Sequence, residues 1–348
     1  MKIAQVSPLF ESVPPKLYGG TERVVSYLTE ELVALGHDVT LFASGDAVTK
    51  AKLEPCCENS LRLDKTCIDS LAHHILMLEK VYERAHEFDI IHNHNDYLAY
   101  PFARDSETPT ITTLHGRLDI PDLIPLYREF SEMPVVSISN SQRKPLPFAN
   151  WITTVYHGLP LDLYPFSDAP EEYFSFIGRI SPEKGLDSAI EIAKQVGIPL
   201  KIAAKVDVVN REYYEKTIKP LLSHPLIQYI GEIGEEEKAE FLGKSLAMLF
   251  PIDWEEPFGL CMIESMACGT PVLARRRGSI PEVIDEGITG YIFRDIEEGI
   301  RALKKTAKID RKRCRQQFEE RFSARRMALD YVRVYEKIIE KKRALLPQ

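Results

Sequence analysis

The stretch that decides the fold lies in the second half of the chain, where residues 254–272 read WEEPFGLCMIESMACGTPV. The run after Gly259 predicts a helix that begins near this glycine. The segment 271–274 that follows directly is short and apolar, which is typical of a buried strand. Helix and buried strand in immediate succession indicate an α/β protein.

The same alternation extends outward over the whole chain. Short β-branched or apolar segments in the first half are 2–6, 39–43, 89–92, 110–114, 135–139 and 152–156, and those in the second half are 174–177, 200–204, 227–230, 247–251 and 271–274. Amphipathic segments lie between them, such as 20–35, where Val24, Leu28 and Leu32 recur at helical spacing. This pattern predicts two doubly wound, Rossmann-like parallel sheets with helices on both faces.

The domain organisation follows from a break in this pattern. Residues 159–172, rich in Pro, Asp and Glu, predict a linker. We therefore expect an N-terminal domain over 1–160, a C-terminal domain over 171–325 and a final helical segment over 326–348. The region 310–346 predicts one long helix with an exposed face. Because ligands of doubly wound sheets bind at the carboxyl ends of the strands, the predicted active site is a cleft between the domains.

Composition excludes several classes of protein. The chain has 348 residues, 44% hydrophobic and 28% charged, which suits a globular protein of two domains. Its net charge of −8, with both signs mixed along the chain, argues against a nucleic-acid partner. It shows no leader and no apolar run of about 18 residues, so we expect a cytoplasmic protein without a transmembrane segment. The six cysteines lack the spacing of a disulfide framework and predict reduced thiols, with a zinc site at Cys56, Cys57 and Cys67 as the alternative.

Two glutamates flank the predicted helix start at Gly259. Glu256 lies just before the helix and Glu264 lies inside it, with seven residues between them. The first-turn amides near Gly259 and Leu260 have no partner within the helix, and the helix dipole favours an anion such as a diphosphate there. Glu264 has the acceptors for vicinal hydroxyls such as those of a ribose. The alternative is a pair of glutamates that face water.

The segment resembles glycosyltransferase family 4, retaining enzymes of the GT-B fold, whose E-x7-E motif is matched by Glu256 and Glu264. The resemblance continues in order through residues 269–274, 278–284 and 287–291. It implies transfer of a hexosyl group, with retention of configuration, from a UDP- or GDP-sugar to a carbohydrate or other hydroxyl acceptor. It also implies that residues 258–260 (Phe258, Gly259 and Leu260) contact the donor and that the final helix crosses back onto the first domain.

A second donor-binding segment is residues 176–185, FIGRISPEKG. Arg179 and Lys184 are cations at a strand end and can bind phosphoryl oxygens, although ordinary surface positions are the alternative. The resemblance assigns both to the donor diphosphate, with Glu256 on the donor sugar, and implies that no cofactor or metal ion is required. Lys205 and Ile233 follow two further strands and are additional candidates for donor contacts.

The N-terminal half offers weaker signals. Gly19 and Gly20 open the helix of 20–35 and permit close approach of a ligand. His115 follows a predicted strand, and the resemblance places it near the donor sugar as a catalytic residue. The resemblance also assigns Ser139-Asn140 to the cleft, where we expect them to contact the acceptor. His157 and Gly158 suggest a linker turn.

Acceptor contacts are the least determined part of the prediction. The sequence His92-Asn93-His94-Asn95-Asp96 suggests acceptor binding by His94 or Asp96, with a metal site at the histidines as the alternative. The three consecutive arginines at 275–277 suit an acidic acceptor or a solvated loop.

Other classes of function stay open at this point. A silent nucleotide-sugar or glycan-binding protein, a GT-B epimerase and a phosphorylase-like enzyme share these motifs. A dehydrogenase does not fit, because no G-x-G-x-x-G with a downstream acidic residue is present. The donor sugar, its base, the acceptor, the pathway, peripheral membrane contact and the oligomeric state are not determined by the sequence.

Overall fold

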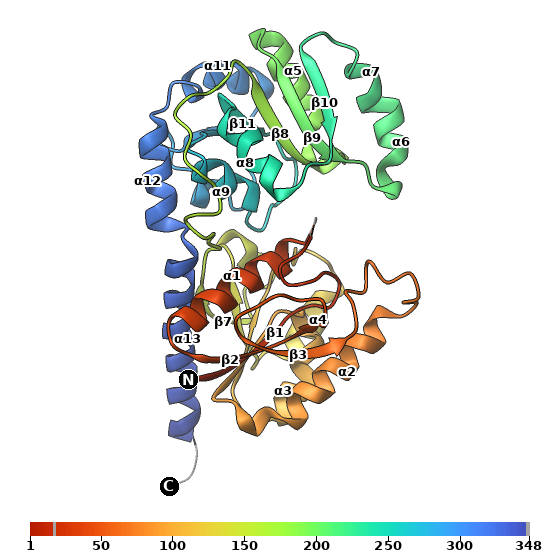
Figure 1. Ribbon diagram of the computed structural model, residues 1–348, viewed down its shortest axis with the longest axis vertical. Helices are drawn as coiled ribbons and strands as arrows, with labels where there is room; N and C mark the ends of the chain where they lie inside the picture. The colour runs from red at the N-terminus through yellow and green to blue at the C-terminus, as the bar shows by residue number, and fades with distance from the viewer. Residues whose placement is uncertain (17–18, 346–348) are drawn as a thin grey trace. The chain divides into compact units, whose positions relative to one another are not determined.

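The computed structural model describes residues 1–16 and 19–345, and the chain forms two compact units. The first unit contains residues 1–158 and the C-terminal segment from Ala324, and the second contains residues 159–323. Each unit is a parallel sheet covered by helices (Figure 1). In the described part of the chain, no helix is long and apolar enough to cross a membrane.

The first unit is built on a seven-stranded parallel sheet of order β3-β2-β1-β4-β5-β6-β7. Its strands are β1 (Lys2–Val6), β2 (Asp38–Ser44), β3 (Lys52–Cys57), β4 (Ile90–Asn93), β5 (Thr110–Thr113), β6 (Pro134–Ser137) and β7 (Asn150–Thr154). Six of these strands were predicted. The missing one, β3, is an edge strand that contains Pro55 and is only partly buried, so it lacks the apolar run that marks a central strand.

The helices of the first unit are α1 (Gly20–Ala34), α2 (Ser70–Glu83), α3 (Tyr100–Asp105), α4 (Leu123–Glu129) and α13 (Ala324–Leu345). Helix α1 buries Val24, Val25, Leu28 and Leu32, the apolar stripe predicted for residues 20–35. Helix α13 packs against α1 (Figure 1), so the end of the chain belongs to the first unit. Residues 346–348 of the predicted final segment lie outside the described residues.

The prediction of a single helix over 310–346 is wrong. The region forms two helices, α12 (Arg311–Arg321) and α13, separated where Leu159 pairs with Ser323 and its amide donates to the Phe322 carbonyl at 2.9 Å. Helix α13 has the exposed face that was predicted, and its opposite face is buried. It buries an apolar and aromatic stripe that is diluted by charge in the sequence and consists of Met327, Ala328, Tyr331, Val334, Tyr335, Ile338 and Ile339.

The second unit is built on a six-stranded parallel sheet of order β10-β9-β8-β11-β12-β13. Its strands are β8 (Phe174–Arg179), β9 (Leu200–Lys205), β10 (Ile227–Gly231), β11 (Ala247–Phe250), β12 (Val272–Arg275) and β13 (Gly290–Phe293). Five of these strands were predicted. The short edge strand β13 was not, because four residues that begin with glycine carry little periodic signal.

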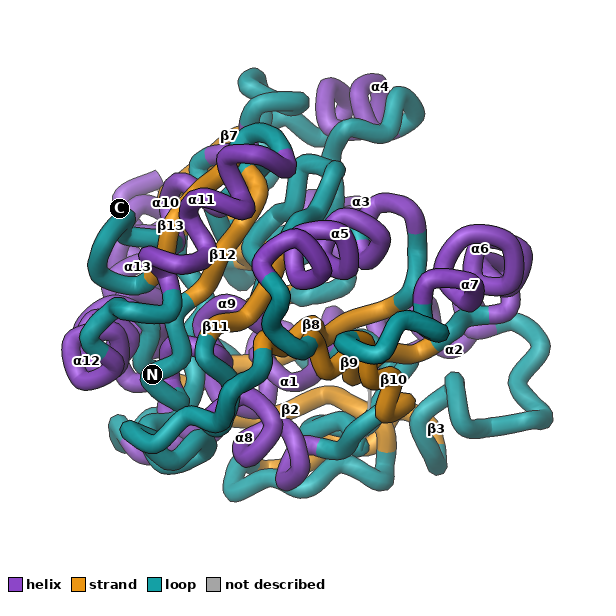
Figure 2. Tube along the Cα trace, turned by 90° about the horizontal axis from the view of Figure 1, so that it is seen from above, coloured by secondary structure: helices purple, strands orange, loops and turns teal. Residues whose placement is uncertain are grey.

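The helices of the second unit are α5 (Leu186–Val196), α6 (Arg211–Tyr213), α7 (Lys219–Leu221), α8 (Glu235–Gly243), α9 (Leu260–Ala267), α10 (Ile280–Val283), α11 (Ile296–Thr306) and α12. Helices α5 and α11 pack together on one face of the sheet, and α8, α9 and α12 pack together on the other (Figure 2). The doubly wound α/β architecture predicted for both halves of the chain is therefore confirmed.

The predicted linker 159–172 belongs to the second unit. Leu159 and Tyr164 are buried, the amide of Ser167 donates to the Cys268 carbonyl at 3.1 Å, and that of Glu171 donates to the Lys244 carbonyl at 2.7 Å. Its proline-rich and acidic composition reflects an irregular segment that is nevertheless fixed along its length by hydrogen bonds.

The strand order places a switch point in each sheet. In the first unit the order reverses direction between β1 and β4, and in the second between β8 and β11. Loops after neighbouring strands diverge at such a point, and the space outside the carboxyl ends of the strands becomes the natural ligand site of the sheet. These two edges carry the residues singled out from the sequence.

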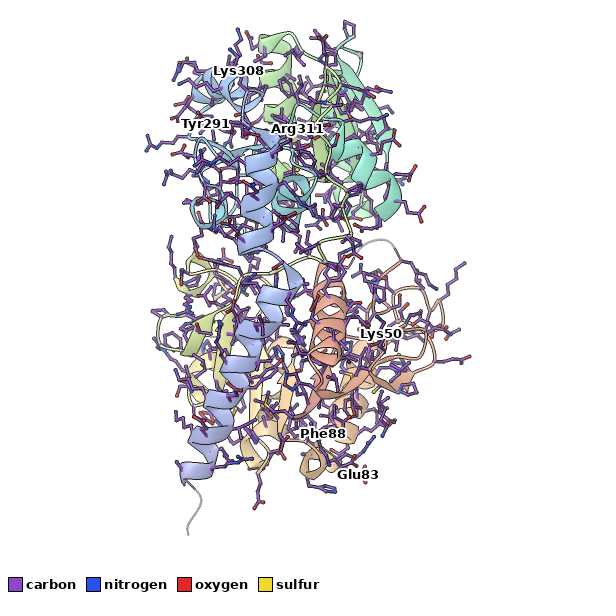
Figure 3. All side chains as sticks on the ribbon, turned by 60° about the vertical axis from the view of Figure 1, so that its left-hand side comes forward. Lys50, Glu83, Phe88, Tyr291, Lys308 and Arg311 are labelled. Atoms are coloured by element: carbon purple, nitrogen blue, oxygen red, sulfur yellow. The ribbon has the colours of Figure 1, made fainter. Side chains whose placement is uncertain are left out.

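Arg311 is the first residue of α12 and is labelled in Figure 3, and its side chain connects several segments of the second unit. Its guanidinium donates four hydrogen bonds, to the carbonyls of Ser167 (2.7 Å), Ser245 (2.8 Å) and Gly243 (2.7 Å) and to the hydroxyl of Thr270 (2.6 Å). These acceptors come from three separate stretches of chain.

Replacing Arg311 with Ala should lower the free energy of unfolding of the second unit by about 3 kcal/mol, because it leaves partly buried carbonyls without a donor. Arg313→Ala is the matched control, since Arg313 is exposed on the same helix. It should cost less than about 0.5 kcal/mol. Urea unfolding measures both, and equal losses for the two variants would contradict this account of Arg311.

Candidate functional site

The centre of the second unit's carboxyl edge is an ion pair between Lys184 and Glu256, with 2.9 Å between Nζ and Oε2. The turn after β8 packs directly against the residue that follows β11. Gly185, at φ +67°, approaches so closely that a Cβ there would lie 2.2 Å from the Pro251 carbonyl oxygen. This contact places Lys184 beside the loop that carries Glu256. Both side chains are largely buried, with 17% and 11% of their surface exposed.

The Glu256 carboxylate is fixed from two further directions. The indole Nε1 of Trp254 donates to the same oxygen, Oε2, at 3.0 Å. On the backbone side, Gly278 approaches so closely that a Cβ would lie 2.3 Å from the Glu256 carbonyl oxygen, which accepts from the Ser279 amide at 3.0 Å. Among the described residues, Oε1 of Glu256 receives no hydrogen bond and is not among the fully buried polar atoms. This oxygen is left for a ligand.

Glu264, which lies about one turn inside α9, is arranged in the same way. Its Oε1 pairs with Nζ of Lys238, on α8, at 3.0 Å, and Lys238 also pairs with Glu235 at 3.3 Å. Glu264 is 4% exposed, yet its Oε2 is neither fully buried nor hydrogen-bonded within the described part of the chain. Each of the two glutamates thus uses one oxygen for a lysine and keeps the other available.

Arg179 and Lys205 end the neighbouring strands β8 and β9 and lie opposite each other in the sheet register. Both reach the carboxylate of Asp207, at 3.7 Å and 3.5 Å, and Arg179 also lies 3.7 Å from Glu183. Arg179 is about one-third exposed. These long, partly solvated pairs are weak, so an incoming anion can displace them at little cost.

The start of α9 lies at this edge, as predicted for a helix that begins near Gly259. Gly259 is the N-cap residue and no side chain caps the helix, which begins at Leu260. The amide of Met262 donates to the Gly259 carbonyl at 3.0 Å. The side chain of Phe258 is 2% exposed and packs against Phe322, with ring centroids 6.2 Å apart. Phe258 therefore offers a ligand only its backbone.

The remaining candidates of the second unit lie on loops or at the end of a strand. Ile233 is half-buried between β10 and α8. Of the three consecutive arginines, Arg275 and Arg277 pair with Asp253, at 3.6 Å and 2.8 Å, while Arg276 is exposed. Asp253 therefore balances one of these three positive charges.

The carboxyl edge of the first unit carries histidines in place of charge pairs. Nδ1 of His94 lies 2.9 Å from Nε2 of His115, and the ring of His115 stacks on that of His157, with centroids 5.3 Å apart. His157, predicted only as part of a linker turn, is buried beside His115. Burial lowers the pKa of His115 to about 3, so its imidazole is neutral near pH 7 and serves as a hydrogen-bonding group.

The residues predicted to bind the acceptor lie at the same edge, but they differ in which polar atoms remain available to a ligand. His94 is buried with both ring nitrogens engaged, to His115 and to Gln5 Oε1 at 2.8 Å. Asp96 is half-buried at φ +46°, and burial raises its pKa to about 6. The hydroxyl of buried Ser139 accepts from the Gln142 amide at 3.1 Å.

Asn140 is exposed, and its side-chain carbonyl accepts from the Thr154 hydroxyl at 2.8 Å. Gly19 is the buried N-cap residue of α1 and Gly20 is the exposed first residue of that helix. Tyr18, which precedes these glycines, lies outside the described residues.

Sequence reasoning missed the partners of these candidates. Lys238 lies 26 residues from Glu264, and nothing in its local pattern separates it from the other charged residues of α8. Nothing in the sequence indicated a role for Asp207 either. Gln5 did give a signal, because it is a polar residue between the apolar Ala4 and Val6 of strand β1, and the structure buries it completely.

Comparison with known proteins agrees with this architecture. The family described as "Glycosyl transferases group 1" matches residues 165–321, and that described as "Glycosyltransferase Family 4" matches residues 18–159. N-acetyl-alpha-D-glucosaminyl L-malate synthase from Bacillus anthracis is 24% identical over 371 residues, covering 91% of this chain and 93% of that protein. Spore coat protein SA from Bacillus subtilis is 24% identical, covering 97% and 100%.

Solved structures show the same fold. Sucrose-phosphate synthase from Thermosynechococcus elongatus aligns with a TM-score of 0.79 at 18% identity, covering 98% of this chain and 100% of that one. The Anabaena protein HepE in complex with UDP and glucose aligns with a TM-score of 0.73 at 18% identity, covering 97% and 100%. With the two family matches spanning most of its length, the chain belongs to glycosyltransferase family 4 and is a glycosyltransferase of GT-B fold.

Proposed function

We propose that this protein transfers a hexosyl group from a UDP- or GDP-sugar to a hydroxyl of a carbohydrate or other acceptor, with retention of configuration and without a metal ion. The observation that carries the proposal is the Lys184–Glu256 pair, which brings a cation and a carboxylate with one available oxygen to the end of β8 and β11. The Anabaena protein HepE, similar in fold, is described as a complex with UDP and glucose.

The diphosphate of the donor would bind to Arg179 and Lys184 beside the start of α9. Arg179 supplies a planar fork and Lys184 a compact ammonium, and the uncapped first turn of α9 adds amides and a partial positive charge. These groups neutralise the charge that develops on the leaving diphosphate, which is the largest electrostatic demand of the reaction. Charge neutralisation by protein groups is why we expect no requirement for a divalent cation.

The two available carboxylate oxygens suit the two sugars of a nucleotide sugar. Oε1 of Glu256 would accept hydrogen bonds from hydroxyls of the donor sugar, and Oε2 of Glu264 would accept them from the ribose. The lysines orient both glutamates in their buried positions, through ion pairs at 2.9 Å and 3.0 Å. In the first unit, His115 offers a neutral hydrogen-bonding group for a sugar hydroxyl.

The chemical step forms one bond and breaks one. The oxygen of the acceptor hydroxyl bonds to the anomeric carbon from the face that the diphosphate leaves, while the bond from that carbon to the phosphate oxygen breaks. The leaving phosphate oxygen takes the proton of the acceptor hydroxyl, so no protein base is needed. Lys184 and Arg179 lower the barrier by stabilising the diphosphate as it departs.

Replacing Lys184 with Met or Glu256 with Gln should lower turnover of the best donor by at least about 100-fold, because each change removes a charge that acts on the reacting groups. The pair Lys216 and Glu212 is the matched control, since it forms a 2.6 Å ion pair on the surface. Lys216→Met and Glu212→Gln should retain near-normal turnover. Circular dichroism shows whether each variant is folded, and near-normal turnover of folded Lys184→Met or Glu256→Gln would rule out the assignment.

The stereochemistry and the metal requirement are tested on the product. A thermal-shift screen of UDP-glucose, UDP-N-acetylglucosamine and GDP-mannose identifies the donor, and NMR of the glycoside formed in excess EDTA gives its anomeric configuration. We expect the configuration of the donor to be retained and the rate to be unaffected by EDTA. Inversion, or loss of activity that Mg²⁺ restores, would contradict the proposal. Binding without transfer would instead indicate a silent nucleotide-sugar-binding protein, and epimerised sugar or a requirement for phosphate would indicate the other GT-B activities.

A further inference from the structure

A buried chain of hydrogen bonds connects helix α13 to His115 within the first unit. It begins at the Tyr335 hydroxyl, which lies 2.7 Å from His92 Nδ1 and accepts from Gln5 Nε2 at 3.0 Å. Oε1 of Gln5 lies 2.8 Å from His94 Nε2, and His94 Nδ1 lies 2.9 Å from His115 Nε2. Tyr335, Gln5 and His92 are fully buried, and His94 is 2% exposed.

A second branch anchors the other end of the His92 ring. Nε2 of His92 lies 2.7 Å from the Thr113 hydroxyl, which lies 2.8 Å from the hydroxyl of Tyr331, one turn before Tyr335 on α13. Both nitrogens of His92 are therefore occupied, and two tyrosines of one helix hold this histidine. A metal ion bound through either nitrogen of His92, part of the histidine metal site considered as the alternative for this sequence, would have to break the hydrogen bond at that nitrogen.

The positions of the hydrogens along the chain follow from chemistry. The carbonyl oxygen of Gln5 only accepts, so Nε2 of His94 must carry a hydrogen. The imidazoles of His92, His94, His115 and His157 crowd together with ring centroids 4.0 to 5.3 Å apart, and burial lowers the pKa of each, so His94 and His115 are neutral. Neutral His94 then has a bare Nδ1 that accepts from His115, and Nε2 of His115 carries the hydrogen.

The same reasoning leaves Nδ1 of His115 without a hydrogen. Among the described residues this atom has no hydrogen-bond partner, and it is not among the fully buried polar atoms. His115 as a whole is half-buried. A lone pair is therefore presented at the carboxyl edge of the sheet, where a hydroxyl of a ligand can donate to it.

We propose that Gln5, held by the hydroxyl of Tyr335, is a positioning residue that fixes His115 in the Nε2–H tautomer and so makes its Nδ1 a hydrogen-bond acceptor for a sugar hydroxyl. The last step, contact with a sugar, rests on the proposed function. The tautomer does not, because it follows from groups of the first unit alone. This tautomer also makes the site specific, because a hydrogen-bond-accepting nitrogen binds a hydroxyl of the ligand and rejects a ligand that presents only a hydrogen-bond acceptor at that point.

The tautomer of His115 depends on Gln5 because the side-chain amide of Gln5 accepts a hydrogen bond through its oxygen and donates one through its nitrogen. If the amide turned over, Nε2 would face His94 and donate to it, and every hydrogen on the path to His115 would reverse, leaving Nδ1 of His115 protonated. The hydrogens at Tyr335, His92 and Thr113 would have to reverse as well, because each of these bonds has one hydrogen. In the structure Nε2 of Gln5 donates to the Tyr335 hydroxyl at 3.0 Å and lies 3.4 Å from His92 Nδ1, and this orientation directs Oε1 to His94.

The test is the tautomer of His115 measured by NMR in protein with ¹⁵N-labelled histidine, without donor, with the His115 signals identified by their loss in His115→Asn. We expect Nδ1 of His115 to resonate as an unprotonated nitrogen and Nε2 as a protonated one near pH 7. A protonated Nδ1 in the natural protein overturns the proposal, and this result requires no variant.

Tyr335→Phe tests the role of α13. It should shift both His115 nitrogens toward values of mixed tautomers and lower turnover roughly tenfold, the equivalent of one hydrogen bond. Tyr82→Phe is the matched control, because it removes a hydroxyl that lies 3.1 Å from Thr110 in the same unit but outside this chain of bonds. It should leave the His115 signals unchanged.

The outcomes for the two proposals are separable. Unchanged His115 signals in folded Tyr335→Phe overturn the positioning role, even if turnover falls, because a loss of turnover alone would report damage to the fold. A shifted tautomer with unchanged turnover supports the positioning role and counts against the part of the proposed function that brings His115 to a sugar.

Discussion

The ion pair of Lys184 and Glu256 depends on how closely three loops of the second unit approach one another. Gly185 and Gly278 lie at positions where a Cβ would come within 2.2 Å and 2.3 Å of backbone oxygens, so only glycine permits these loops to meet. Without that approach, Lys184 would be a surface cation and Glu256 a surface carboxylate, the interpretation that statistics favour for either residue alone. The close approach of the backbone brings Lys184 and Glu256 together, and their side chains then form the ion pair.

The carboxyl edges of the two sheets differ in their electrostatic character. The edge of the second unit contains ionised pairs, Lys184 with Glu256 and Lys238 with Glu264, which suits a charged diphosphate and polar sugar hydroxyls. The edge of the first unit carries four imidazoles that burial keeps neutral, and two of them, His92 and His94, form hydrogen bonds with hydroxyl and amide groups. A neutral network with defined donors and acceptors selects hydroxyl groups by direction instead of by charge.

The fold was largely predictable because its signals are local. Apolar spacing identified α1, and short buried runs identified the central strands of both sheets, whereas the edge strands β3 and β13 lack such runs. The break between α12 and α13 was missed because it is set by the pairing of Ser323 with Leu159, which is distant in sequence. The stripe of α13 was hidden because its aromatic residues are interspersed with Lys, Arg and Glu.

The motif residues of the candidate site could be predicted from the sequence, but the residues that contact them could not. Arg179, Lys184, Glu256 and Glu264 stand out because family resemblance and chemistry agree on them. Lys238, Asp207 and Tyr335 do not, because their importance comes from contacts across the fold with residues far away in the sequence. Composition and spacing describe what a segment can become, and only packing decides which side chains it meets.

A crystal structure of the protein with the nucleoside diphosphate of its donor bound would test the central claim most directly. The account predicts that oxygens of the diphosphate lie within hydrogen-bond distance of Lys184 Nζ and the Arg179 guanidinium at the start of α9, with ribose hydroxyls on Glu264. A diphosphate bound elsewhere on the protein, with Lys184 and Glu256 undisturbed, would contradict it.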